Sequence, residues 1–186
     1  MTSTPFRRLR TSIASLCLLV GLILSASVAQ AIDETEVIDA ALVTYVHGMT
    51  DEIAQETVGP EGVPVLLRLL ADPSFPRRDN VVAYLAYLGD DSATAALTAF
   101  LRNPPASLDV AEEDRAALVA PEALARIASR GNPQALEVLL AITEDGSNGG
   151  VLGASATRSS RPDQMRRDLL DMAVRALGFA GRFNVF

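Results

Sequence analysis

Apolar residues recur about every 3.6 positions along most of this chain, which is the period of an α-helix with one buried face. Glycine, proline and capping residues lie between these stretches and mark the expected helix ends. No stretch shows the alternating pattern of a half-buried strand, so the fold class that we expect is all-α. The predicted helices cover residues 34–47, 51–58, 63–70, 77–89, 90–101, 112–130, 134–143 and 162–179.

Three places depart from this regular pattern. Pro121 lies inside the predicted helix 112–130 and removes a backbone donor, so we expect a kink or a break into two helices there. Residues 144–161 are rich in glycine and serine without a sustained period, which predicts a long flexible loop. The apolar tail, residues 183–186, is expected to fold back over the exposed end of the helical array; docking on a partner is the alternative.

One predicted helix occurs twice. Residues 77–89, RRDNVVAYLAYLG, return as residues 166–178, RRDLLDMAVRALG. An internal repeat predicts a supersecondary unit that buries its apolar face by stacking on copies of itself. The shared polar and glycine positions, which we interpret as structural, are Arg77, Arg78, Asp79 and Gly89 in the first copy and Arg166, Arg167, Asp168 and Gly178 in the second.

The stretch around the first copy resembles a HEAT repeat. In residues 69–101, LLADPSFPRRDNVVAYLAYLGDDSATAALTAFL, an apolar helix, an Asp-Pro turn, an arginine-led second helix and Gly-Asp follow one another. Asp72 and Arg78 fall on the family's aspartate and arginine positions, which the resemblance implies stabilise the turn between paired helices. For residues 32–186 the resemblance implies a short right-handed α-solenoid, of the armadillo type, with about three HEAT-like helical pairs.

Residues 1–31 have the three parts of a secretory signal peptide. A segment with three arginines precedes an apolar core at residues 16–24, and Ala-Gln-Ala at residues 29–31 forms a small-x-small cleavage site. We therefore expect the mature chain to begin at Ile32 and to be periplasmic or secreted. The alternative is an uncleaved membrane anchor and a tethered scaffold, because residues 11–32 carry no charge and are long enough to span a bilayer.

Charge argues against one class of partner. The chain has 16 basic and 23 acidic residues and a formal net charge of −7, and three of its arginines precede residue 32. Residues 32–64 hold eight carboxylates and no arginine. A nucleic-acid-binding domain presents a basic patch, so we expect no nucleic-acid partner. The simplest interpretation of the acidic residues is a set of solvated helix faces.

The ionisable residues offer little for catalysis. His47 is the only histidine, and a metal site with Asp51 would lack the three or four ligands that such sites need. The only cysteine lies in the signal segment, so a Ser-His or Cys-His system would have to run through His47. The acidic clusters at residues 51–52 and 112–114 lie in helix first turns, which favour negative charge. We expect no catalytic residue, no cofactor and no metal; an enzyme or ligand-binding protein using an inter-helix pocket stays the alternative.

Binding of another protein is the function that remains. With the apolar stripe of helix 77–89 assigned to the core, the helical wheel turns Asn80 and Tyr87 outward and leaves Tyr84 at the border. Tyrosine is enriched in protein interfaces, so these three residues are the predicted partner-binding positions. They are not repeated, since the second copy has Leu169, Ala173 and Ala176 there.

Overall fold

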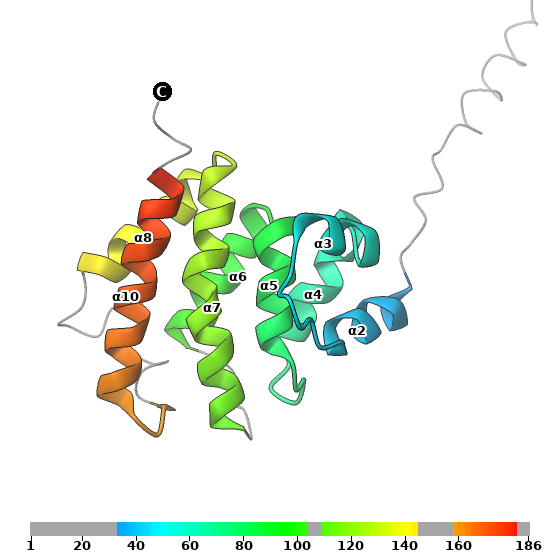
Figure 1. Cartoon of the computed structure of the whole chain (residues 1–186), viewed down its shortest axis with the longest axis horizontal. Helices are drawn as coiled ribbons and strands as arrows, with labels where there is room; N and C mark the ends of the chain where they lie inside the picture. The colour runs from blue at the N-terminus through cyan, green and yellow to red at the C-terminus, as the bar shows by residue number, and fades with distance from the viewer. Residues whose placement is uncertain (1–32, 104–108, 145–157, 182–186) are drawn as a thin grey trace, which may run out of the picture. The chain divides into compact units, whose positions relative to one another are not determined.

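The computed structural model describes residues 33–103, 109–144 and 158–181, all within the compact unit Ile32–Phe186. Within these ranges the chain is all-α, with eight α-helices, one short 3-10 helix and no strand, which confirms the predicted fold class. The helices are α2 (Glu34–Leu42), α3 (Asp51–Thr57), α4 (Val63–Ala71), α5 (Arg78–Leu88), α6 (Asp91–Arg102), α7 (Val110–Ser129), α8 (Pro133–Glu144) and α10 (Pro162–Gly181) (Figure 1).

Polar side chains cap the helices where the sequence predicts it. The Thr50 hydroxyl accepts a hydrogen bond from the backbone N–H of Ile53, and the Asp90 carboxylate accepts one from the backbone N–H of Ser92 at 2.9 Å. Such bonds satisfy N–H groups that have no partner within the helix. Pro121 lies inside α7, which continues through it, so of the two outcomes expected there the break into two helices is wrong and the kink stays a prediction.

The first helix is shorter than predicted. The sequence pattern runs to His47, but α2 ends at Leu42 and Val43 is extended, with φ −65° and ψ 143°. The Asn80 side-chain amide donates hydrogen bonds to the carbonyl oxygens of Ala41 and Val43, each at 2.8 Å. These bonds satisfy carbonyls that a further helical turn would otherwise use, and they let the chain leave the helix.

Six of the described helices form two rows of contacting neighbours. α5, α7 and α10 lie side by side in one row, and α4, α6 and α8 contact one another in the same order in the second (Figure 1). The core lies between the rows, and α7 is central to it because it contacts both α5 and α10. Small side chains allow this close packing, and the fully buried alanines of α7 are Ala116, Ala117, Ala120, Ala123 and Ala125.

The turn between α4 and α5 depends on Asp72. Its carboxylate accepts hydrogen bonds from the backbone N–H of Ser74 at 2.8 Å and from the Ser74 hydroxyl at 2.7 Å. The same bonds hold the pKa of Asp72 below its ordinary value, because they favour the charged carboxylate. The Asp72 carboxylate therefore fixes the conformation of the turn at Ser74.

The two repeat copies occupy their helices differently. Arg78 is the first residue of α5, whereas its counterpart Arg167 lies in the second turn of α10. Gly89 follows the end of α5, but α10 continues past Gly178 to Gly181. The repeated sequence therefore begins and ends at different positions within its two helices.

Three predicted segments lie outside the described residues. They are the signal peptide at residues 1–31, the central part of the predicted loop at residues 145–157 and the tail at residues 183–186. Among the helices that are described, none is both long and apolar enough to cross a membrane.

Candidate interaction surface

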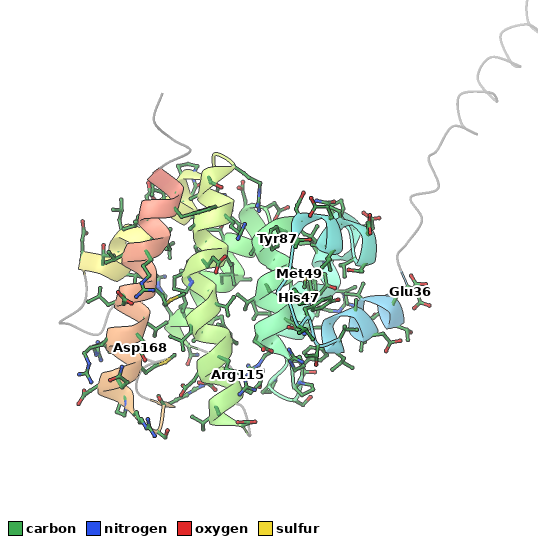
Figure 2. All side chains as sticks on the ribbon, in the orientation of Figure 1. Glu36, His47, Met49, Tyr87, Arg115 and Asp168 are labelled. Atoms are coloured by element: carbon green, nitrogen blue, oxygen red, sulfur yellow. The ribbon has the colours of Figure 1, made fainter. Side chains whose placement is uncertain are left out.

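The three predicted contact residues of α5 all hold one segment, residues 43–50, which joins α2 to α3. Besides the Asn80 bonds described above, the Tyr87 hydroxyl donates to the carbonyl oxygen of Met49 at 2.8 Å (Figure 2). The Tyr84 hydroxyl contacts the hydroxyl of Tyr45, and the two rings meet edge to face with centroids 6.1 Å apart. Asn80, Tyr84 and Tyr87, the predicted partner-binding residues, therefore hold a segment of their own chain in place.

Burial corrects the predicted orientation of α5. The Tyr84 side chain is fully buried and Asn80 is 8% exposed, so the prediction that Asn80 faces outward and that Tyr84 lies at the border is wrong. The reason is that α5 is covered on more than one side, since α2, α3, α4 and α7 all contact it. Only Tyr87 keeps a partly exposed side chain, and partner contact stays a prediction for this residue.

Comparison with α10 shows why the helical wheel failed. Val174 occupies the repeat position of the fully buried Leu85, yet it is 54% exposed. The face that α10 buries instead carries Met165, Leu169, Ala173, Ala176 and Ala180. Three of these positions correspond to Asn80, Tyr84 and Tyr87, so the face on which the copies differ is the face that both helices bury.

Burial also determines the chemistry of Tyr84. Loss of solvent raises the pKa of its hydroxyl well above the ordinary value of tyrosine, because the charged form would be poorly solvated. The hydroxyl therefore stays protonated and lies 2.8 Å from the Thr57 hydroxyl oxygen. We missed Tyr45 and Thr57, because their contacts join residues 39 and 27 positions apart in the sequence.

Residues 43–50 and the end of α2 carry apolar side chains into solvent. Leu42 is 42% exposed, Val43 is 48% exposed and Val46 is 84% exposed. The sequence predicts a helix over residues 34–47, but α2 ends at Leu42, so residues 43–47 do not extend its buried face. The result is a cluster of exposed apolar residues on a segment that hydrogen bonds hold in place, and we call Leu42, Val43 and Val46 the apolar cluster.

A hollow of about 230 Å³ lies between α5 and α7 beside this segment, and its lining includes Met49, Tyr87, Glu122 and Arg126. The Arg126 guanidinium lies over the Tyr87 ring, 4.5 Å from its centroid, and 5.3 Å from the centroid of Phe179 in α10. It also donates to the Glu122 carboxylate at 2.9 Å. Contacts of a cation with aromatic faces are attractive, so Arg126 links α5, α7 and α10 on this side of the molecule.

A second group of charges is buried between α5 and α7. The Arg78 side chain is fully buried, its backbone N–H donates to the Glu112 carboxylate at 2.9 Å, and its Nε lies 3.6 Å from the same oxygen. The guanidinium also lies 5.5 Å from the centroid of the Phe100 ring in α6. Glu113 is 3% exposed and lies 4.0 Å from Arg158. The pair Arg78–Glu112 joins α5 to α7, so we assign it to stability.

His47 lies exposed in residues 43–50 (Figure 2). Within the part of the chain that the structure describes, no three His, Cys, Asp or Glu side chains are grouped to hold a metal ion. In comparisons with known proteins, neither a family model nor a curated protein nor a solved structure matches this chain. The resemblance to HEAT repeats accordingly depends on the residues of the repeat alone.

Proposed function

We propose that this protein is a non-catalytic protein-interaction module or scaffold that works in the periplasm or after secretion. The apolar cluster is the observation that carries the proposal, because Val46 is 84% exposed on a segment fixed by hydrogen bonds to α5. Contiguous exposed apolar surface is a feature of interaction sites, and a segment that is already ordered loses little entropy on binding. The partner is another protein with an apolar surface.

The proposed architecture is a short right-handed α-solenoid of HEAT-like pairs. Its support is the order of neighbours, in which α4–α5, α6–α7 and α8–α10 are successive contacting pairs and each row continues from one pair to the next. Stacked helical pairs present extended surfaces for binding, which suits a scaffold.

The alternative is an enzyme or small-ligand-binding protein that uses an inter-helix pocket. A groove of about 750 Å³ between α6 and α8 is the observation that favours this alternative. Its lining contains one carboxylate, that of Asp91, and does not include His47. Acid–base catalysis uses titratable groups that converge on a substrate, so this groove supports binding better than catalysis.

Photo-crosslinking tests the apolar cluster directly. With p-benzoylphenylalanine in place of Val46, the full chain expressed in its own host should give a discrete protein adduct after irradiation, detected by immunoblot. The same amino acid at Glu56, an exposed position on α3, is the matched control and should give none. If positions 46 and 56 behave alike, the interaction surface is not where we place it.

N-terminal sequencing tests the predicted export of the protein. We expect N-terminal sequencing of the protein isolated from its host to begin at Ile32, because the small-x-small site ends at Ala31. Detection in the periplasmic or culture fraction should accompany this start. A protein that begins near Met1 and sediments with membranes would instead identify the tethered scaffold.

A further inference from the structure

The groove between α6 and α8 presents one continuous face of α6. The seven α6-side residues that line it follow the three- and four-residue spacing of a single helix face. α8 supplies the opposite wall through Gln134 and Val138. The α6-side residues are Asp91, Thr94, Ala95, Thr98, Ala99, Arg102 and Asn103.

The two ends of this face carry opposite charges. Asp91 opens α6 and Arg102 closes it, and both side chains are exposed. Eleven residues separate them, which corresponds to about 16 Å along a helix. The Asn132 amide donates to one oxygen of the Asp91 carboxylate, whereas Arg102 makes no hydrogen bond or ion pair within residues 33–103, 109–144 and 158–181. The groove is therefore negative at one end and positive at the other.

Amide side chains are available along the groove. The Thr98 hydroxyl donates to the carbonyl of Thr94 at 2.7 Å, so it is used within α6. Asn103 and Gln134 have no hydrogen-bond partner for their side chains among the described residues. An amide offers both donors and an acceptor, which matches the exposed N–H and C=O groups of an extended peptide. A helical ligand satisfies these backbone groups internally and would leave the amides unused.

A smaller apolar hollow continues the groove at its positive end. It lies between α4 and α6, has a volume of about 160 Å³ and shares Ala99 and Asn103 with the groove. Its walls include Leu67, Leu70 and Phe100. Apolar cavities of roughly this volume accept a group the size of a benzene ring, so the hollow suits one large apolar side chain.

We propose that this groove binds an extended peptide segment of a partner protein. A basic residue of the peptide lies at Asp91 and an acidic residue lies at Arg102, four residues away at roughly 3.3 Å per residue, because an even spacing keeps both side chains on one face of an extended chain. The length of the side chains covers the rest of the distance of about 16 Å. A large apolar side chain next to the acidic residue enters the hollow between α4 and α6. This site goes beyond the apolar cluster, because it uses different helices and a different class of contact.

A titration of the ¹⁵N-labelled protein with the pentapeptide RSNLD, blocked at both ends, tests the proposal by NMR. We expect saturable shifts confined to the backbone amides of residues 91–103 and 132–138 and of the neighbouring hollow. The R102E substitution should weaken binding about two- to fivefold, the range for a single exposed ion pair. A peptide with arginine in place of the aspartate should bind R102E better than it binds the unchanged protein.

R175E is the matched control, because it reverses one exposed arginine on α10 and changes the net charge equally. It should leave the affinity for both peptides close to that of the unchanged protein. Equal responses of R102E and R175E, shifts outside the groove, or helix-type transferred NOEs in the bound peptide would each overturn the proposal. The crosslinking result at position 46 does not depend on these three outcomes. The experiments can therefore contradict the groove proposal without contradicting the apolar cluster, and the reverse.

Discussion

Replacing Arg78 by alanine should lower the free energy of unfolding by about 3–5 kcal/mol, the usual cost of removing one partner of a buried ion pair. The guanidinium is fully buried beside the Glu112 carboxylate, and Glu112 itself is 3% exposed. Without Arg78, a buried carboxylate loses its charged neighbour and gains no water in exchange. Urea denaturation followed by circular dichroism at 222 nm measures the change.

Arg167 supplies the control for this experiment, because it occupies the same position in the second repeat copy. It is exposed on α10 and donates to the Gln164 side chain at 2.9 Å. Arg167→Ala should change the free energy of unfolding by no more than about 0.5 kcal/mol, as surface substitutions usually do. Similar losses for the two variants would show that Arg78 is not the buried anchor that its contacts indicate.

Alanine at the two repeat glycines should change stability in opposite directions. A Cβ atom at Gly89 would lie 2.4 Å from the carbonyl oxygen of Leu85 and 2.6 Å from the Cβ of Ala93, so Gly89→Ala should cost about 1–3 kcal/mol through overpacking. A Cβ at Gly178 meets nothing within 4 Å and lies inside α10. Gly178→Ala should therefore stabilise the protein by about 0.5–1 kcal/mol.

Thermal unfolding of the two single variants and of the double variant measures these effects. Because Gly89 follows α5 and Gly178 lies within α10, and added Cβ atoms would share no neighbour within 4 Å, the double variant should show the sum of the single changes. The prediction is contradicted if both substitutions destabilise, since the two glycines would then serve the same structural role.

The sequence predicts the helices themselves well, for a physical reason. Helical period and caps are local properties, so Thr50 and Asp90 begin their helices where the pattern places them. The end of α2 depends on Asn80, which lies 37 residues beyond Val43 in the sequence. A side chain that distant leaves no trace in the local pattern around residues 43–47, and the helix was therefore predicted too long.

The candidate surface was harder to predict, because one helical wheel cannot show how many neighbours a helix has. Leu85 and Tyr84 are both fully buried, although they lie on different sides of α5. A match between two copies shows which residues are shared, but it does not show which face is buried, as the exposure of Val174 illustrates. The exposed cluster at Leu42 and Val46 became visible only once the end of α2 was known.

The bonds between α5 and residues 43–50 set a condition for lengthening this protein by design. Asn80, Tyr84 and Tyr87 of α5, the first helix of the α5–α7–α10 row, hold this segment in place. An additional helical pair inserted ahead of α4 would displace that segment and bring a new helix against the same side of α5. A working extension would then need shorter, apolar side chains at these positions, like those that α10 carries at Leu169, Ala173 and Ala176. These three side chains therefore restrict what can pack against that side of α5.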